Sequence, residues 1–406
     1  MTGPLNSSMA QQPTSSLAWL DSLQGSGIRP GLGRMRTLLR ALGNPHRAVT
    51  AVIVAGTNGK GSTSAMLTSI LNASGYRTGH YTSPHLVELR ERWTIAGEMI
   101  DAALLEECIV ALQTLESDIT PTYFEALTLI AFLAFARARC DVAVLEVGMG
   151  GRLDATNVVK PLAALITPVG IDHTEYLGNT IRKIAAEKAG VIHRGAIVLT
   201  SNDDPRVLEV VRRRAAKFGN RFIHVTEEHD TPLTGQCQRR NAGLAVRAAR
   251  ELKTALPRIT DETIARGVAS TRWRGRLEHL QVRGKDIWID GGHNAHAIAA
   301  TSRFFDANVP RPRLLVFGMM SDKDVEAVVA LLFPLFDRVI ATEPYPPRSV
   351  RAETFRGAMA IPDPDEAFRA ALDAPEPGLV ITGSLYLAGA AIAFFDKIRG
   401  HDSDRT

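Results

Sequence analysis

Apolar runs and amphipathic stretches alternate along most of the chain. Apolar runs that end in glycine or polar residues are typical of buried strands, whereas apolar positions with helical spacing are typical of helices. Strands are predicted at residues 51–55, 141–147, 162–166 and 196–200, with a loop or short strand at 80–89. Helices are predicted at residues 64–71, 98–115, 122–139 and 180–189, after two short helices that are broken at 25–33. This alternation predicts a mainly parallel sheet wrapped by helices.

A second alternating series begins near Leu277. Its predicted strands are residues 286–290, 313–318, 338–342 and 378–382, and its predicted helices are 295–305, 324–335 and 363–372. A chain of 406 residues is longer than one compact core usually holds. The predicted fold class is therefore α/β, with an N-terminal P-loop ATPase-like domain at 17–272 and a smaller C-terminal Rossmann-like domain at 273–406. The predicted hinge is the segment 271–276.

Composition indicates where the protein works and which kinds of partner it can bind. Residues 1–16 are rich in Ser, Gln, Pro and Gly and lack the apolar core of a signal peptide, which predicts a disordered tail. The longest apolar stretch, residues 126–136, is too short to span a bilayer, so no membrane association is predicted. Three widely spaced cysteines form no disulfide or metal pattern and predict a cytoplasmic protein. A net charge of +4 suits anionic substrates, but no basic and aromatic cluster indicates nucleic-acid binding.

The segment 56–63, Gly-Thr-Asn-Gly-Lys-Gly-Ser-Thr, lies between a predicted strand and a predicted helix. In that position, backbone N–H groups and the positive end of the helix can cradle phosphate. Lys60 would reach the terminal phosphates, and Ser62 or Thr63 could approach a metal ion. The general pattern has Gly where Val54 stands and Ser or Thr where Gly61 stands. An ordinary glycine turn is the alternative, but the flanking strand and helix favour nucleotide binding.

Carboxylates follow three of the predicted strands. Glu146 ends the strand at 141–147, at the sheet edge where ligands of open α/β sheets bind, and it could hold Mg²⁺. The loop Asp172-His-Thr-Glu175 could ligate a metal ion or be a polar turn. Asp290 follows another strand, and Arg276 lies at the predicted hinge. These two charges could close over a nucleotide and exclude water, or they could be solvated surface charges.

Ten segments in order resemble the folylpolyglutamate synthase/dihydrofolate synthase family of the Mur-ligase superfamily. They are residues 56–63, 81–86, 122–125, 145–157, 172–178, 187–190, 275–278, 291–294, 317–324 and 382–386. The resemblance covers nearly the whole chain from about residue 17. It implies an ATP-dependent ligase that adds L-glutamate to reduced folates, and also to dihydropteroate, through an acyl phosphate. The implied partners are these small molecules, and the implied state is a monomer.

The resemblance also implies roles for individual residues. The phosphate cradle would be Thr57, Asn58, Gly59, Lys60, Gly61 and Ser62, with Asn241, Arg276 and Asp290 contacting ATP from the other side. The Mg²⁺ ligands would be Ser83, Glu146 and His173. Lys188 would carry a carbamate that helps to hold a second Mg²⁺, so the catalytic set would be Lys60, His173 and Lys188. The pterin pocket would include Thr122, Tyr123, Phe124, Glu125 and Leu153.

One departure from the family pattern concerns the substrate. Family members that make dihydrofolate carry an acidic residue near the position of Arg29-Pro30, and its absence puts the dihydrofolate synthase activity in doubt. A folylpolyglutamate synthase without the second activity is therefore one alternative. Another Mur-type ligase is a second, although only about fifty residues precede the phosphate loop. A nucleotide-binding protein without catalysis is a third, and the presence of Lys60, Glu146, His173 and Lys188 argues against it.

Overall fold

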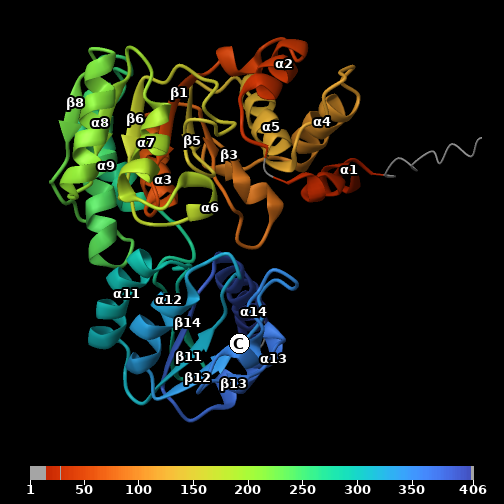
Figure 1. The fold of residues 1–406 in the computed structure, drawn as a ribbon, viewed down its shortest axis with the longest axis vertical. Coiled ribbons are helices and arrows are strands. Elements are labelled where there is room, and N and C mark those ends of the chain that lie inside the picture. Colours follow the sequence, from red (N-terminus) through yellow and green to blue (C-terminus); the bar gives the residue numbers. More distant parts are fainter. Residues whose placement is uncertain (1–14, 28, 404–406) are drawn as a thin grey trace, which may run out of the picture.

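The computed structural model describes residues 15–27 and 29–403, which form two α/β lobes, one above the other in Figure 1. The described part of the first lobe has an eight-stranded sheet in the order β4-β3-β2-β5-β1-β6-β7-β8. The strands are β1 (Thr50–Ala55), β2 (Thr78–Tyr81), β3 (Trp93–Ile95), β4 (Glu98–Met99), β5 (Val142–Glu146), β6 (Ala163–Ile166), β7 (Ile197–Thr200) and β8 (Phe222–His224). Strand β3 pairs with β2 and β4 in antiparallel fashion, and the other pairs are parallel.

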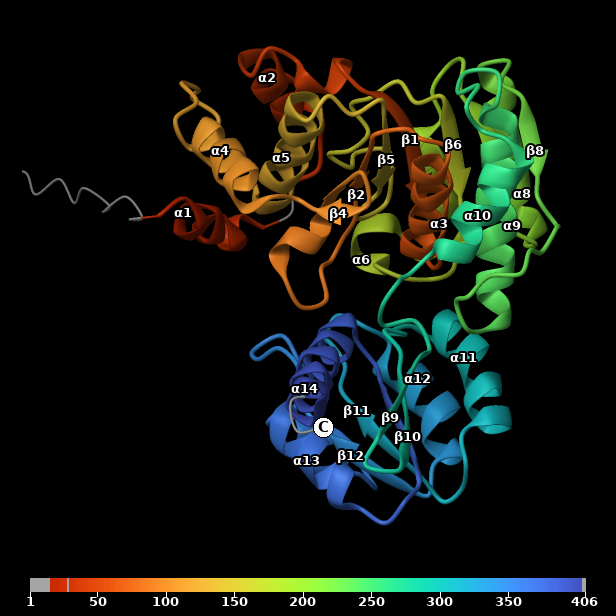
Figure 2. The same ribbon diagram turned by 180° about the vertical axis from the view of Figure 1, so that it is seen from behind.

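Helices cover both faces of this sheet (Figures 1 and 2). They are α1 (Ser16–Ser22), α2 (Gly33–Ala41), α3 (Lys60–Ala73), α4 (Ala102–Gln113), α5 (Tyr123–Arg137), α6 (Thr174–Leu177), α7 (Ile181–Lys188), α8 (Pro205–Lys217), α9 (Gln236–Leu252) and α10 (Asp261–Ser270). Alternate side chains of β1 reach opposite faces. Ile53 joins the core that contains α5, whereas Val52 and Val54 join the core that contains α3 and α9.

The second lobe has a six-stranded sheet in its described residues, in the order β13-β12-β11-β14-β10-β9. Its strands are β9 (Glu278–Val282), β10 (Lys285–Ile289), β11 (Arg313–Phe317), β12 (Arg338–Ala341), β13 (Met359–Ala360) and β14 (Gly378–Thr382). Its helices are α11 (Ala295–Asn308), α12 (Val325–Leu332), α13 (Pro364–Asp373) and α14 (Leu385–Ser403). The pair β9–β10 is antiparallel and the others are parallel. One core lies between the sheet and α13 and α14, and another lies on the α11 and α12 side.

Short 3₁₀ helices join several of these elements. They are η1 (Leu23–Ser26), η2 (Pro45–Arg47), η3 (Leu89–Arg92), η4 (Ala189–Val191), η5 (Phe333–Leu335) and η6 (Ala352–Thr354). Within the described residues, no helix is both long enough and apolar enough to cross a membrane. The carboxyl ends of β1, β5 and β6 lead into the loops that face the second lobe, and these loops carry the chemistry described below.

The predicted α/β class with two mainly parallel sheets is confirmed. The single helix predicted at 98–115 is wrong at its start, because Glu98–Met99 pair as β4 and Asp101 then caps α4. The helix predicted from residue 64 begins earlier, at Lys60. Helices α8, α9, α10 and α14 were not predicted. The predicted tail at 1–16 falls outside the described residues except for Ser15, which caps α1, and Ser16.

Candidate active site between the lobes

The phosphate loop connects the buried strand β1 to helix α3. Gly56 and Gly59 both have positive φ angles, of 152° and 84°, and a Cβ at Gly56 would lie 1.8 Å from Thr167 Oγ1. The backbone N–H groups of Thr57 and Asn58 donate to the carbonyl of Pro168, at 2.9 and 3.2 Å. These two N–H groups are therefore committed within the protein. The amides that remain to meet phosphate are those at the first turn of α3, which begins at Lys60.

Two opposite charges lie beside this turn, a half-buried Lys60 and a buried Glu146. Lys60 donates from Nζ to the carbonyl of Thr57 at 3.0 Å, and burial lowers the pKa of Lys60. Glu146 ends β5, and burial raises its pKa although the charge of Lys60 opposes that shift. The hydroxyl of Thr82 and the N–H of Ser83 both donate to Oε2 of Glu146, the latter at 3.3 Å. No hydrogen bond reaches Glu146 Oε1 from any described residue, so that oxygen is available to a cation.

Lys188 is a second buried lysine, at the end of α7. Its Nζ donates to the carbonyl of Gly56 at 2.7 Å, which places the amine directly beside the phosphate loop. Burial and the positive charge of Lys60 lower the pKa of Lys188 to about 7. A substantial fraction of the amine is consequently neutral, and therefore nucleophilic, at neutral pH.

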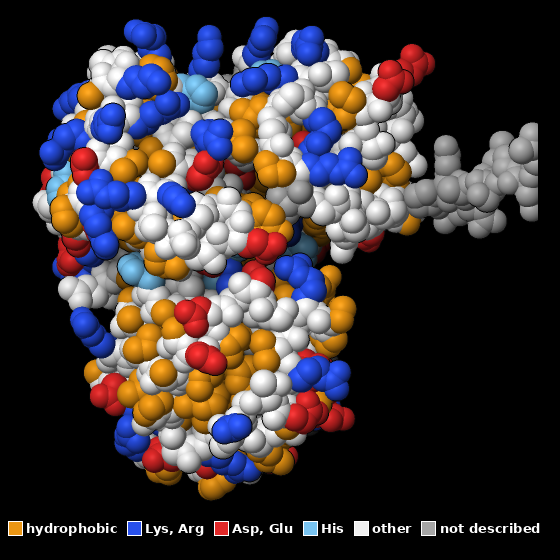
Figure 3. All heavy atoms as spheres, viewed as in Figure 1, with side chains coloured by type: hydrophobic (Ala, Val, Ile, Leu, Met, Phe, Trp, Pro, Cys, Tyr) orange, Lys and Arg blue, Asp and Glu red, His pale blue; other side chains and the backbone are white. Residues whose placement is uncertain are grey.

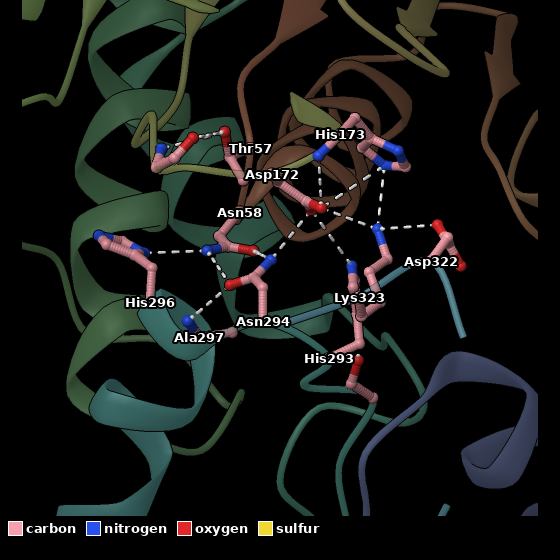
Figure 4. A network of polar contacts seen from close by, with 12 residues as sticks. Thr57, Asn58, Asp172, His173, His293, Asn294, His296, Ala297, Asp322 and Lys323 are labelled. Carbon is pink, nitrogen blue, oxygen red and sulfur yellow. Dashed lines mark hydrogen bonds and ion pairs between the residues drawn. The ribbon is translucent and has the colours of Figure 1, made fainter. Parts of the chain in front are cut away.

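The second lobe contacts the phosphate loop through a pair of amides (Figure 4). Asn58 and Asn294 each donate Nδ2 to the Oδ1 of the other, at 3.1 Å in both directions. Asn58 Nδ2 also lies 2.9 Å from Nδ1 of His296 on α11. Asn294 caps α11 by accepting from Ala297 N–H, and its Nδ2 reaches Asp172 Oδ2 at 3.2 Å. The side chain of Asn294 in the second lobe therefore contacts the phosphate loop and Asp172 of the first lobe, and it also caps its own helix α11.

Asp172 also pairs with a lysine of the second lobe. Lys323 Nζ lies 2.8 Å from Asp172 Oδ1 and 3.1 Å from Nε2 of His173, and both Lys323 and Asp172 have largely buried side chains. Burial alone would raise the pKa of Asp172, but His173 and Lys323 hold it well below its usual range. Burial lowers the pKa of His173. The structure thus places an ammonium group at the nitrogen predicted to bind metal, and a metal ion could use that nitrogen only if Lys323 moved.

The other residues predicted to contact ATP also lie at this interface. Asp290 accepts hydrogen bonds from the N–H groups of Leu277 and Gly292, at 3.1 and 2.8 Å, and burial raises its pKa. Arg276 donates to the carbonyl of Gly275 at 2.9 Å, and its charge acts on both Glu146 and Lys60. Asn241 is buried so close to the loop that a Cβ at Gly59 would lie 2.4 Å from its Oδ1. Figure 3 shows His and charged side chains along the waist between the lobes.

Known proteins are similar to this chain over most of its length. Residues 54–247 match the Mur ligase middle domain family, and residues 275–385 match the family described as Mur ligase, glutamate ligase domain. The dihydrofolate synthase/folylpolyglutamate synthase of Bacillus subtilis (strain 168) is 34% identical over 412 residues, covering 91% of this chain and 96% of that protein. The chain belongs to the folylpolyglutamate synthase/dihydrofolate synthase family. It is an ATP-dependent glutamate ligase.

Two solved structures show the same fold. E. coli FolC in complex with DHPP and ADP has a TM-score of 0.85 and 28% identity, over 96% of this ligase and 99% of that chain. A bifunctional folylpolyglutamate synthase/dihydrofolate synthase with Mn, AMPPNP and L-glutamate bound has a TM-score of 0.85 and 30% identity, over 95% of this ligase and 100% of that chain. Those proteins bind nucleotide at a fold that this ligase shares in full.

The predicted pterin pocket of this ligase lies at the start of α5. Thr122 and Glu125 form the predicted capping box, with the Glu125 carboxylate accepting from Thr122 N–H at 2.8 Å. Glu125 is buried and also paired with Arg34, whose Nη2 and Nε lie 2.9 and 3.2 Å from its two oxygens. Phe124 packs so closely on Gly148 that a Cβ there would lie 2.3 Å from its Cζ, and Leu153 is exposed. The carboxylate is thus already committed to Arg34 and Thr122, whereas Phe124 and Leu153 offer apolar surface.

Sequence reasoning overlooked several residues of this site. Lys323 lies inside the family segment 317–324, and a lysine between Asp322 and Asp324 was a signal of a charged contact. Asn294 and His296 come shortly after Asp290, at the start of a predicted helix, and polar side chains at that place were a similar signal of a contact. Arg34 carried no signal, because its partner Glu125 lies in a different helix far along the chain.

Proposed function

We propose that this ligase adds L-glutamate to reduced folates and to dihydropteroate. The observation that carries the proposal is the meeting of the two lobes at the phosphate loop, where Asn58 contacts Asn294 and the charges of Lys60 and Glu146 act on each other. The relatives support the substrate class, since the B. subtilis protein is named for both activities and FolC binds DHPP. The cytoplasmic location and the monomeric state stay predictions from the sequence.

The reaction follows from the weakness of a carboxylate as an electrophile. Transfer of the γ-phosphoryl group of ATP to the substrate carboxylate makes an acyl phosphate and releases ADP. The neutral amine of L-glutamate then attacks the acyl carbon, the C–O bond to phosphate breaks, and the amine loses a proton. Lys60 and the free amides at the first turn of α3 would hold the phosphoryl oxygens and neutralise their developing charge. The contacts between Asn58 and Asn294 would help to exclude water from the acyl phosphate.

The donor set at Glu146 fits a hard divalent cation. Carboxylate and hydroxyl oxygens are the ligands that Mg²⁺ prefers, and Glu146 has Oε1 without a hydrogen-bond partner among the described residues. Glu146 and Ser83 would hold the ion, and His173 would join them once Lys323 had left its nitrogen. When bound, Mg²⁺ would neutralise charge on the β- and γ-phosphate oxygens. The related bifunctional enzyme binds Mn together with AMPPNP.

Lys188 would act as a carbamate. Its neutral amine can add CO₂, and the product is an anion beside the carbonyl of Gly56 in a site that contains the cation Lys60. That anion would help to hold a second Mg²⁺ ion. The support is the burial of Lys188 and its pKa of about 7, since an exposed lysine would be protonated and unable to react.

A second candidate function is polyglutamylation without the dihydropteroate reaction. The segment that carries Arg29 presents no carboxylate toward α5. The carbonyl of Arg29 instead accepts from Arg34 Nη2 at 2.9 Å, and Arg34 in turn binds Glu125. If a free acid is needed to bind dihydropteroate at this place, the ligase would act only on folates that already carry glutamate.

Phosphate release from purified full-length protein tests both candidates. One reaction contains ATP, Mg²⁺, L-glutamate and dihydropteroate, and the other replaces dihydropteroate with tetrahydrofolate. The product of each reaction is checked by mass. We expect glutamate-dependent release in both reactions, with products heavier by one glutamyl residue. Release with tetrahydrofolate alone would support the second candidate, and no glutamate-dependent release in either reaction would contradict the proposed function.

A further inference from the structure

A tryptophan between the lobes rests on the phosphate-loop helix. Trp273 lies in the segment between α10 and β9, and Gly61 is the second residue of α3. A Cβ at Gly61 would lie 3.1 Å from both Cζ2 and Nε1 of the indole and 3.3 Å from Cε2. Gly61 has no positive φ angle, so its backbone does not require glycine. A side chain at Gly61 would thus be in tight contact with the indole, which favours the smallest residue where the general phosphate-loop pattern has Ser or Thr.

The indole also lies beside a histidine of β2. The His80 and Trp273 rings have centroids 5.6 Å apart at an interplanar angle of 46°. His80 Nε2 lies 2.9 Å from Ser64 Oγ, and Ser64 Oγ donates to the carbonyl of Gly61 at 2.9 Å. Burial lowers the pKa of His80 to about 4, so this ring is neutral and pairs with the hydroxyl without a charge. Trp273 therefore contacts both β2, through His80, and the first turn of α3, through Gly61.

The same segment carries the arginine that faces the site. Three residues after Trp273, Arg276 places a charge that acts on Lys60 and Glu146. The next residue, Leu277, has a positive φ of 47° and donates its N–H to the buried Asp290. The segment 273–277 is thus anchored at both ends. Trp273 contacts Gly61 of the first lobe, and Leu277 donates to Asp290 of the second lobe.

We propose that Trp273 is a positioning residue that couples the phosphate loop to Arg276. Its indole keeps the first turn of α3 and the segment between the lobes in one geometry, so that nucleotide held by the loop lies within reach of Arg276. The proposal rests on the proposed function only in that nucleotide binds to this loop. It also predicts that Gly61 and Trp273 depend on each other: a methyl group at Gly61 harms the site only while the indole is present.

The test is a double-mutant cycle on the full chain. ADP affinity is measured by calorimetry for the wild type and for the variants Gly61→Ala, Trp273→Ala and the double variant. We expect Gly61→Ala to weaken ADP binding by about tenfold in the wild type and by less than about twofold in Trp273→Ala. An equal loss in both backgrounds would overturn the proposal, because the two positions would then act independently. Because the readout is ADP binding, it stays informative even if glutamate ligation fails.

Two further readouts separate positioning from simple support of the fold. Trp273→Phe should restore most of the kcat that Trp273→Ala loses, since a smaller aromatic ring can still rest on Gly61. The change in tryptophan fluorescence on ADP addition should vanish in Trp273→Phe and persist in Trp288→Phe, whose ring stacks on His279 in the second lobe. A full ADP-dependent signal in Trp273→Phe, or no recovery of kcat over Trp273→Ala, would contradict the proposal.

Discussion

At the scale of single residues, Lys60 and Lys188, the two lysines beside the phosphate loop, differ in their partners. Lys60 has Glu146 among the charges that act on it, and that carboxylate favours its charged form. Lys188 has a carbonyl oxygen as its hydrogen-bond partner, and burial together with the like charge of Lys60 lowers its pKa to about 7. We therefore expect Lys60 to act as a phosphate-binding cation and Lys188 as a reactive amine.

Lys188→Met should abolish the carbamate while keeping the apolar stem. We expect kcat to fall by about 100-fold, with ADP affinity changed much less, because a metal-holding anion is lost and the phosphate loop is not. Steady-state kinetics and calorimetry on the same preparation check this expectation. Unchanged kcat in Lys188→Met would contradict the role of Lys188.

The wild type should depend on CO₂ in a pH-dependent way. Below a pKa of about 7 the Lys188 amine is protonated and cannot add CO₂, and above it the neutral amine can. Enzyme stripped of CO₂ at low pH should regain activity faster when it is moved to about pH 8 with bicarbonate than without it. Equal recovery in both buffers would argue against carbamylation.

Phe124→Ala should act on folate binding alone. The ring packs on Gly148, and its centroid lies 6.2 Å from that of the Tyr81 ring. We expect the folate KM to rise by about tenfold while the ATP KM stays nearly constant. Equal changes in the folate KM and the ATP KM would show that Phe124 does not line the folate pocket.

At the scale of elements, the start of α5 carries both a helix cap and the predicted pterin pocket. The capping box of Thr122 and Glu125 was predictable from sequence, because it depends on residues three apart. Its link to α2 through Arg34 was not predictable, since the pairing is created only when distant helices pack. The same limit applies to Glu98–Met99, where pairing with β3 overrides the helical pattern.

Thr122→Ala tests this element, and Thr260→Ala at the capping box of α10 is the matched control. Each substitution should lower the free energy of unfolding by about 1 kcal/mol, measured by chemical denaturation. Only Thr122→Ala should also raise the folate KM, because α10 packs on α3 rather than on the pocket. A rise in folate KM in both variants would indicate a general loss of rigidity instead.

At the scale of the whole molecule, the site exists only where the lobes meet. The alternation of strands and helices, the phosphate loop and the strand-end carboxylates could be predicted because each depends on local pattern and on the rule that ligands bind at carboxyl ends of strands. The contacts of Asn58 with Asn294 and of Asp172 with Lys323 could not, because they depend on how two separately folded sheets face each other. Figure 4 shows that these contacts form one continuous network.

Loss of Lys323 should loosen this interface. Lys323→Met leaves the carboxylate of Asp172 buried without its lysine partner. Hydration of that carboxylate should then favour separation of the lobes. We expect a larger radius of gyration in solution scattering of the ligand-free protein, together with a lower kcat. Lys217→Met on the exposed end of α8 is the control and should change neither. An unchanged radius of gyration in Lys323→Met would show that the ion pair does not hold the lobes together.

We expect the substrate carboxylate to be activated as an acyl phosphate. This is measured with a folate in which both oxygens of the reacting carboxylate are the heavy isotope, together with ATP and L-glutamate. Phosphoryl transfer to that carboxylate predicts that each released phosphate contains one heavy oxygen, because the C–O bond breaks when the amine of glutamate attacks. Phosphate without the label, or label found in AMP, would contradict the account.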